Sequence, residues 1–187
     1  MSVLSVSKSE THTFSKPTTP SITLIKHLGV EGDAHAGVTD QHRSRKHLNP
    51  PPANLRQVHL IQSEILHEVI DHSSEEPLKP GDLGENIATT GIDLLNLSKG
   101  TKLRFVDGED AASESAVITV TGLRNPCYQI DKFREGLKER FVVRDSARAI
   151  TGRKAGIMAT VELGGEIRPG MRIVVEQPDV YEKLACV

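Results

Sequence analysis

The feature that most constrains the fold is a series of short apolar segments, rich in β-branched residues and separated by glycine, proline and polar turns. The clearest segment spans residues 116–123, where apolar residues alternate with threonines as in a half-buried strand. We predict the other strands at residues 3–6, 22–25, 57–61, 99–105, 157–163 and 169–175. About seven short strands spread along the chain predict a mainly β (α+β) fold, a closed or partly open, mostly antiparallel β-barrel with a few short helices.

The connecting segments carry further expectations. A Ser/Thr/Pro stretch at residues 15–21 suits a hairpin between the first two strands. Ser63 is a candidate N-cap for a helix over residues 64–70, and apolar residues at helical spacing predict another helix over residues 128–141. Residues 77–97 contain too many glycines and prolines for a long regular element, so we predict an extended loop with functional potential there.

Composition places the chain among ordinary globular proteins. Its 187 residues suit a single domain, and its net charge of -2 gives no support for a nucleic-acid or anionic-membrane partner. No apolar run approaches the roughly 20 residues needed to cross a bilayer, and residues 1–16 lack a signal peptide's hydrophobic stretch. We therefore expect a cytoplasmic protein. Aromatic residues make up only 3%, which argues against a base-stacking surface.

The chain contains two cysteines, Cys127 and Cys186, which we expect to be free thiols. Pro126 ends the preceding strand, so Cys127 should lie at a constrained corner between a strand and a helix. The helix dipole and Arg124 would favour its thiolate, the form that attacks sulfur donors and binds soft metals. The alternative is a small buried apolar residue without reactivity. Cys186 lies in a tail where disorder is the default, and we assign it no function.

A glycine-rich segment, GVEGDAHAG at residues 29–37, is followed by a basic one, QHRSRKH at residues 41–47. Glycines such as Gly32 would allow backbone N–H groups to face an anion. Arg43 and Arg45 would supply the counter-charge for phosphate or for an oxyanion such as molybdate. The alternative is a solvated basic loop with glycine turns.

The same region offers groups for orientation, proton transfer or metal binding. Asp33 and His35 are candidates for orienting a ligand or moving a proton. With His42 they could instead bind a metal, although the spacing matches no standard zinc pattern.

A further motif, PGDLGENI at residues 80–87, combines turn glycines with polar side chains. It is either a structural turn whose polar groups bind local backbone or one wall of a cleft. Arg56 and His59 either face the same cleft or lie on a solvated edge. The cleft candidates from the motif are Gly84, Glu85 and Asn86.

Four segments of the chain resemble, in order and spacing, the motifs of the MOSC domain family, which is named after the C-terminal part of molybdenum-cofactor sulfurases. They are GVEGDAHAG at 29–37, RQVHLI at 56–61, PGDLGENI at 80–87 and LRNPC at 123–127. The resemblance implies one MOSC domain over residues 1–187, with a pyruvate-kinase-barrel-like core at about 20–175. It also implies that Cys127 accepts sulfur as a persulfide, or binds the metal, and that the domain binds the molybdenum cofactor (molybdopterin). The residues expected to hold the cofactor are Gly32, Asp33, His35, Arg43, Arg45, Arg56, His59, Gly84, Glu85, Asn86, Arg124 and Asn125.

The resemblance also suggests partners. The large sulfurases carry a pyridoxal-phosphate domain, for which this chain has no room, so pyridoxal phosphate would act only through a separate partner enzyme. The sulfur donor would be a cysteine desulfurase or a small persulfide, and the acceptor would be the molybdenum cofactor or a molybdoenzyme. Small stand-alone relatives are linked to molybdenum-dependent detoxification of N-hydroxylated bases. The alternatives are a non-catalytic module that binds or chaperones the cofactor and a structural barrel with an inert cysteine.

Overall fold

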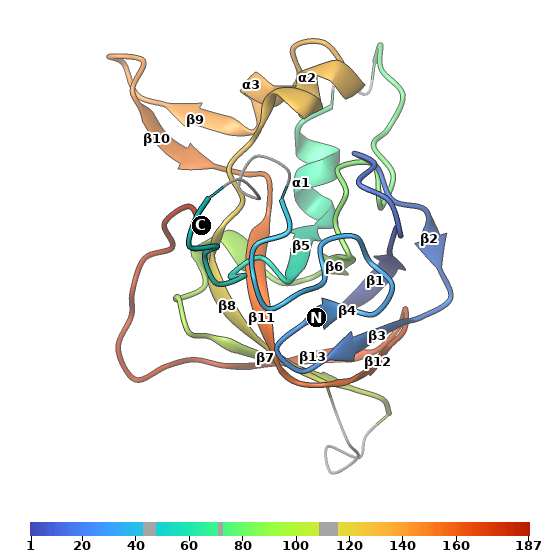
Figure 1. Ribbon diagram of the computed structural model, residues 1–187. Coiled ribbons are helices and arrows are strands. Elements are labelled where there is room, and N and C mark those ends of the chain that lie inside the picture. The colour runs from blue at the N-terminus through green and yellow to red at the C-terminus, as the bar shows by residue number, and fades with distance from the viewer. Residues whose placement is uncertain (43–47, 71–72, 109–115) are drawn as a thin grey trace.

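The computed structural model describes residues 1–42, 48–70, 73–108 and 116–187. Its centre is a closed barrel with the strand order β13-β7-β8-β11-β5-β6-β1, in which a pairing of Ser2 with Arg172 joins β1 back to β13 (Figure 1). The barrel strands are β1 (Ser2–Ser7), β5 (Val58–Gln62), β6 (Ile87–Thr90), β7 (Lys102–Val106), β8 (Val117–Leu123), β11 (Ile157–Leu163) and β13 (Arg172–Glu176). Among these strands, neighbours run antiparallel except for β5 and β6, which run parallel. The predicted mainly β fold with a mostly antiparallel barrel is therefore confirmed.

The alternating side chains of the strands fill the barrel. In β7, Leu103 and Phe105 are fully buried, while Lys102 and Arg104, which alternate with them, are partly exposed. The neighbouring β8 contributes Ile118 to the same apolar core. Each such side chain stabilises the fold by about 1.5–3 kcal/mol. Closing the sheet pairs both of its edges, which removes the open edges that favour aggregation.

Two glycine turns set up neighbouring barrel strands, as their sequence pattern predicts. Gly100 and Gly170 adopt φ angles of +85° and +90°, which favour glycine. The strands that follow them, β7 and β13, pair antiparallel with Lys102 opposite Glu176. The repeated glycine-strand pattern therefore produces one hydrogen-bonded pair.

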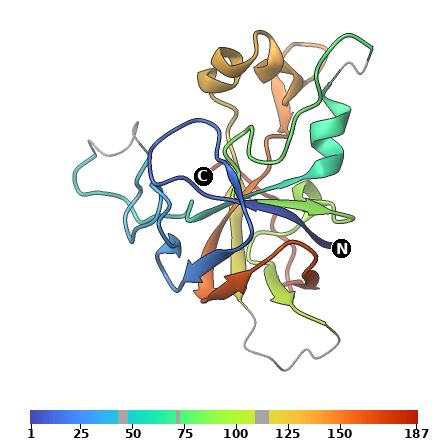
Figure 2. The ribbon, with the colours of Figure 1, turned by 90° about the vertical axis from the view of Figure 1, so that its right-hand side faces the viewer.

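Smaller elements surround the barrel. The three-stranded sheet contains β12 (Gly165–Ile167), β3 (Ile22–Ile25) and β4 (Gly29–Val30), and β2 (Thr18–Thr19) pairs with β1. A 3-10 turn, η1, covers Leu94–Asn96. One end of the barrel carries α1 (Ser63–Glu68), α2 (Tyr128–Phe133), α3 (Leu137–Arg140) and the hairpin of β9 (Val142–Arg144) and β10 (Ile150–Arg153) (Figure 1 and Figure 2). No helix in the described ranges is long and apolar enough to cross a bilayer.

A second apolar cluster fastens these helices to the barrel. Ile130 of α2, Leu137 of α3 and Phe141 are fully buried, and they share this cluster with Ile61 of β5 and Leu66 of α1. Buried apolar side chains therefore anchor α2, and with it the corner between β8 and α2, to the barrel.

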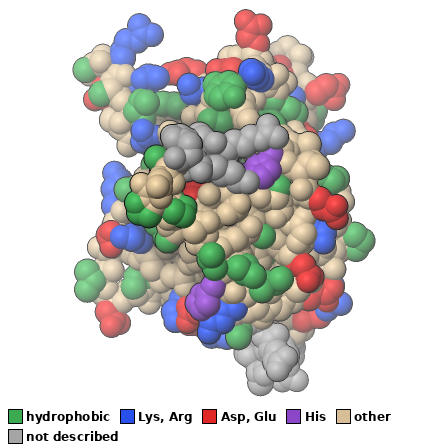
Figure 3. Space-filling view, viewed as in Figure 1, with side chains coloured by type: hydrophobic (Ala, Val, Ile, Leu, Met, Phe, Trp, Pro, Cys, Tyr) green, Lys and Arg blue, Asp and Glu red, His purple; other side chains and the backbone are tan. Residues whose placement is uncertain are grey.

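Charges of both signs are mixed on the surface. On the face shown in Figure 3, basic and acidic side chains lie side by side around the periphery.

Two predicted segments differ from the structure. The helix predicted over residues 128–141 is divided in two, because Arg134 is extended and Gly136 takes a φ of +71°. Residues 77–97 are predicted to form an extended loop without a long regular element, and they contain the short strand β6 (Ile87–Thr90). This strand forms because β1 and β5, both far away in sequence, pair with it on either side.

Three finer predictions are wrong as well. The stretch at residues 15–21 does not connect a hairpin, since β1 pairs with β2 whereas β3 pairs with β4 and β12. Ser63 is the first residue of α1 rather than its N-cap, which is Gln62, and no side-chain hydrogen bond caps this helix. The tail is ordered, because Leu184 is buried in the barrel core and Cys186 forms a bridge with Leu123.

We expect Leu103→Ala to lower the free energy of unfolding by about 2–5 kcal/mol, because it leaves a cavity in the barrel core. Leu4→Ala is the matched control, since Leu4 lies in β1 and is 45% exposed. The control should change the stability by about 0.5 kcal/mol or less. Urea unfolding followed by circular dichroism measures both changes, and equal losses would contradict the assignment of the core.

Candidate functional site

A pocket of about 270 Å³ collects residues from segments far apart in sequence. Most of the residues predicted for a site contribute to it. The predicted residues that line the pocket are His35, Arg56, His59, Gly84, Asn86, Arg124, Asn125 and Cys127. Three others, Gly32, Asp33 and Glu85, are described but do not border it, and Arg43 and Arg45 lie outside the described residues.

Cys127 lies at the predicted corner. It follows β8 and occupies the N-cap of α2 with extended backbone angles. Its side chain is partly exposed and borders the pocket, and its Sγ lies 3.9 Å from Oε1 of Gln129. The thiol is therefore accessible from the pocket. This observation argues against the alternative that Cys127 is a buried residue without reactivity.

Arg124 places a buried positive charge beside this thiol. The residue is 8% exposed, and its guanidinium carbon lies 5.9 Å from the centre of the Phe14 ring. Burial lowers the pKa of Arg124, while the neighbouring Cys127 and Glu85 act in the opposite direction. Within the described part of the chain, the buried Nη1 atom of Arg124 has no hydrogen-bond partner. A buried N–H group without an acceptor is costly, so an anionic oxygen at this wall of the pocket would be stabilised.

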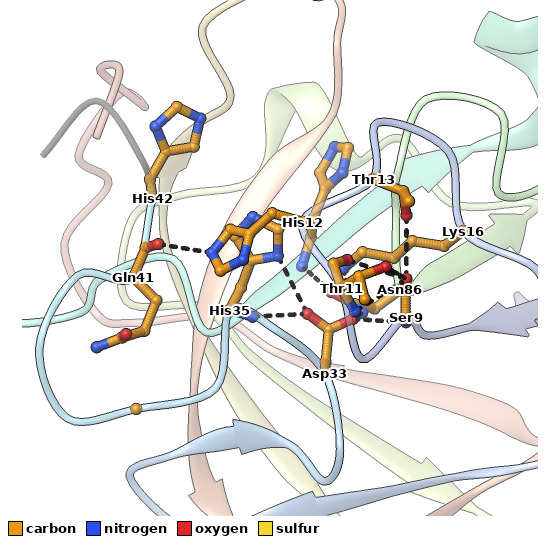
Figure 4. A network of polar contacts seen from close by, with 12 residues as sticks. Ser9, Thr11, His12, Thr13, Lys16, Asp33, His35, Gln41, His42 and Asn86 are labelled. Atoms are coloured by element: carbon orange, nitrogen blue, oxygen red, sulfur yellow. Dashed lines mark hydrogen bonds and ion pairs between the residues drawn. The ribbon is translucent and has the colours of Figure 1, made fainter. Parts of the chain in front are cut away.

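Asp33 lies behind the pocket wall and holds several of its residues together. One carboxylate oxygen lies 2.7 Å from Nζ of Lys16 and accepts a hydrogen bond from Nδ2 of Asn86 at 3.0 Å. The other accepts hydrogen bonds from the backbone N–H of His35 at 2.9 Å and from Nδ1 of His35 at 3.1 Å (Figure 4). Burial alone would raise the pKa of Asp33, but the hydrogen bond from His35 and the charge of Lys16 hold it well below its ordinary value. Asp33 therefore orients its neighbours as a fixed anion.

His35 presents its ring to the pocket from this network. Burial lowers the pKa of His35 despite the neighbouring Asp33, which favours the neutral imidazole near pH 7. Because Nδ1 donates to Asp33, the neutral ring leaves Nε2 as an acceptor. The ring of His12 lies 5.0 Å from that of His35, and that of His42 lies 6.4 Å from it, measured between centroids.

The glycine segment does not offer an anion the set of backbone N–H groups that its sequence suggested. Gly32 takes a φ of +73° in a turn, as expected for glycine. The N–H groups of Asp33 and Ala36 donate to carbonyls within the segment, and that of Gly37 donates to Leu28. The N–H of Ala34 donates to Ser9 of a neighbouring loop. Side chains, rather than these amides, therefore supply the positive charge of the pocket.

The segment at residues 80–87 has a mainly structural role. Glu85 is completely buried and accepts a hydrogen bond from the N–H of Gly81 at 2.5 Å, and burial raises its pKa. Asn86 donates to the Ser7 carbonyl and accepts a hydrogen bond from the N–H of His59, which ties this loop to β1 and β5. Gly84 is required by its surroundings, because a Cβ there would lie 2.3 Å from the Phe14 carbonyl oxygen.

Sequence inspection missed several pocket residues. Lys16, in the connection between β1 and β2, is 6% exposed, and burial lowers its pKa despite the pairing with Asp33. Phe14 and Gln129 also line the pocket, and so does Cys186 of the tail. No local pattern marks these residues, since each reaches the pocket only through contacts made by the folded chain.

The alternative of a metal site built by Asp33, His35 and His42 gains no support. Within the described ranges, no three His, Cys, Asp or Glu side chains are arranged to hold a metal ion. The carboxylate of Asp33 is already engaged by Lys16 and His35.

His59 is a buried histidine on the pocket wall. It is 5% exposed, and its Nε2 lies 2.9 Å from the Ala155 carbonyl oxygen. Burial, followed by the charge of Arg124, holds the pKa of His59 well below its ordinary value. The folded protein therefore keeps this imidazole neutral at a pH where the unfolded chain protonates it.

We expect the free energy of unfolding to fall as the pH drops below about 6.5, because the unfolded chain then binds protons that folded His59 and His35 exclude. For His59 the loss should approach about 1.4 kcal/mol per pH unit. Urea unfolding between about pH 5 and pH 7 measures this slope. His59→Gln should flatten it, and His67→Gln, at an exposed position of α1, is the matched control. An unchanged slope in His59→Gln would contradict the assignment.

Comparisons with known proteins identify the family. The sequence matches the family model of the MOSC domain over residues 32–174.

The crystal structure of the YUAD protein from Bacillus subtilis matches with a TM-score of 0.74 at 22% identity, over 95% of this chain and 96% of that chain. YiiM from Escherichia coli matches with a TM-score of 0.59 at 18% identity, over 98% of this chain and 73% of that chain. YiiM from Geobacillus stearothermophilus matches with a TM-score of 0.56 at 16% identity, over 94% of this chain and 73% of that chain. No functionally curated protein matches the sequence. The resemblance drawn from the four motifs is confirmed: the chain belongs to the MOSC domain family.

Proposed function

We propose that this MOSC protein binds the molybdenum cofactor (molybdopterin) in the pocket and acts as a sulfur carrier or sulfurtransferase through a persulfide on Cys127. The observation that carries this proposal is that Arg124, whose guanidinium has a buried N–H without an acceptor among the described residues, and the partly exposed thiol of Cys127 line the same pocket. The first is suited to a phosphate or oxyanion and the second to sulfur chemistry.

The residues around the pocket suit the anionic part of the cofactor. Arg124 has a buried N–H without an acceptor among the described residues, and Arg56 and Lys16 add two further cationic side chains to the lining. The volume of about 270 Å³ lies near the lower end of small-molecule sites, roughly 300–1,000 Å³. The pocket therefore fits a small ligand or the phosphate-bearing part of a larger one. When bound, the cofactor supplies a phosphate for these cations and a metal that can accept sulfur.

The thiol performs the sulfur step. The thiolate of Cys127 attacks the outer sulfur of a donor persulfide, and the sulfur–sulfur bond of the donor breaks, so that the donor leaves as a thiolate. The Arg124 guanidinium places a positive charge beside the Cys127 thiol. Neutral His35, with Nε2 as an acceptor, is the pocket's candidate for taking the thiol proton.

The donor and the acceptor belong to the same proposal. A cysteine desulfurase or a small persulfide would supply the sulfur, so pyridoxal phosphate acts only in a partner enzyme. A molybdoenzyme would receive the sulfurated cofactor. Detoxification of N-hydroxylated bases, which the family resemblance suggests, stays a prediction. The non-catalytic alternative, a cofactor-binding or chaperone module, would use the same cations of the pocket without the thiol.

We expect Arg124→Gln to raise the Kd for the molybdenum cofactor by about 10- to 100-fold, because a hydrogen bond to a charged group contributes about 1.5–3 kcal/mol. Arg172→Gln is the matched control, since Arg172 is an exposed residue of β13 away from the pocket lining. An anaerobic binding titration with purified cofactor measures both constants. An unchanged Kd in folded Arg124→Gln would overturn the anion site.

We expect Cys127→Ser to abolish sulfur uptake at position 127, because a hydroxyl cannot replace the thiolate in attack on sulfane sulfur. Peptide mass spectrometry after incubation with glutathione persulfide locates the added sulfur, and urea unfolding confirms that the variant is folded. Wild-type levels of sulfur on Cys127→Ser would contradict the carrier role. If the wild-type protein binds the cofactor but takes up no sulfur, the non-catalytic module is favoured instead.

A further inference from the structure

Two thiols, not one, border the pocket. Cys127 reaches it from the corner before α2, and Cys186 reaches it from the tail, although 59 positions separate them in the sequence. Both are free, and Cys186 is the more exposed. Cys186 also lies beyond residues 32–174, the stretch that the family model matches.

The tail is held against the barrel by a series of backbone contacts. The N–H of Leu123 donates to the Ala185 carbonyl at 2.8 Å, and the N–H of Val187 donates to the Leu123 carbonyl at 3.3 Å. Cys186 is thereby bridged to Leu123, which is four positions before Cys127. Farther back, the N–H of Lys99 donates to the Glu182 carbonyl at 2.9 Å. The position of the second thiol is therefore set by the fold.

Gly122 makes this approach possible. A Cβ at this position would lie 2.4 Å from the Ala185 carbonyl oxygen and 2.7 Å from a methyl carbon of Val187. Any larger residue at position 122 would push the tail away. The glycine therefore connects a local feature of the strand to the location of Cys186.

The surroundings of Cys186 are basic. Burial raises its pKa, whereas the charges of Arg153 and Arg56 act in the opposite direction. Arg56 lines the pocket, and Nε of Arg153 donates to Oδ1 of Asn125, two positions before Cys127. These cationic side chains offset part of the cost of forming a thiolate at Cys186, and their charge would stabilise a departing hydrosulfide.

We propose that Cys186 is the resolving thiol for sulfur held on Cys127, an inference that rests on the proposed carrier function. The Cys186 thiolate attacks Sγ of the Cys127 persulfide, and a bond forms between the two cysteine sulfurs. The bond from Sγ to the outer sulfur breaks, and that sulfur leaves with the electron pair as hydrosulfide. The two cysteine sulfurs are oxidised to a disulfide as the sulfane sulfur is reduced to sulfide, and a dithiol reductant then restores both thiols.

This chemistry explains why a sulfur carrier would place two thiols on one pocket. The outer sulfur of a persulfide is two electrons more oxidised than sulfide, so an acceptor that takes up sulfide requires a source of two electrons. A pair of thiols supplies these electrons at the place where the sulfur is released. With the second thiol, the sulfur leaves as sulfide before any external reductant acts, and the dithiol reductant is needed only afterwards to reopen the disulfide.

The test begins by loading the wild-type protein and Cys186→Ser with glutathione persulfide and removing the excess by gel filtration. Sulfide release is then followed without added reductant, and the chain is alkylated and digested to identify linked peptides. The wild-type protein should release its sulfur as sulfide and yield a Cys127–Cys186 disulfide. Cys186→Ser should retain the persulfide on Cys127 and release sulfide at least about tenfold more slowly, because it lacks the intramolecular thiol.

Gly122→Val provides a second variant with both cysteines intact. Displacing the tail should abolish the disulfide and slow sulfide release as Cys186→Ser does, while the protein still takes up sulfur. Urea unfolding checks that the variant is folded, and Cys186→Ala replaces it as the second variant if it is not.

The outcomes separate this inference from the proposed function. Sulfur uptake by Cys127→Ser at the wild-type level overturns the carrier role itself. Normal uptake on Cys127, with equal persulfide lifetimes in the wild-type protein and Cys186→Ser and no linked peptide, overturns only the resolving role of Cys186.

Discussion

A buried carboxylate that must remain paired organises the pocket. Removing a charge from water costs several kcal/mol unless partners and hydrogen bonds compensate for it. Asp33 meets this requirement through Lys16 from the β1–β2 connection, His35 from the turn after β4, and Asn86 from the loop before β6. The same contacts fix three separate connections relative to the barrel and direct Lys16 and His35 to the pocket.

The charged groups in and behind the pocket differ in how many of their hydrogen-bond partners are supplied by other residues of the protein. Asp33 is engaged on both oxygens, whereas Glu85 accepts a hydrogen bond on Oε1 and keeps a buried Oε2 without a partner among the described residues; neither acid lines the pocket. Arg124 keeps a buried N–H that no described residue accepts. This imbalance favours an anionic ligand, and it lies beside a thiol that the barrel and α2 hold at a corner. Positive charge and an accessible thiol are the two physical requirements of an anion-binding sulfur carrier.

The match to the MOSC family does not by itself describe this pocket. Lys16 and Phe14 precede residues 32–174, and Cys186 follows them, yet all three line the cavity. The segments that bring them there are held by specific contacts: Lys16 by a buried ion pair, and Cys186 by tail hydrogen bonds that depend on Gly122. Two proteins that share the family motifs can therefore differ in the chemistry of the completed site.

The sequence by itself determined the local parts of this protein. Alternating apolar residues predicted the core strands, the glycines at 100 and 170 predicted turns before paired strands, and Pro126 predicted a corner at Cys127. Such patterns succeed because they depend on neighbours along the chain. They fail where distant partners decide, as in β6, which becomes a strand only because β1 and β5 pair with it.

The site shows the same division. Its motifs indicated His35, Arg124 and Cys127, but the amides of the glycine segment proved to be engaged in turns, and Glu85 proved to hold a backbone turn. Only the tertiary structure decided that Lys16 is buried against Asp33 and that Cys186 shares a pocket with Cys127. The physical reason is that closing the barrel sets which distant segments meet, and no local pattern records that register.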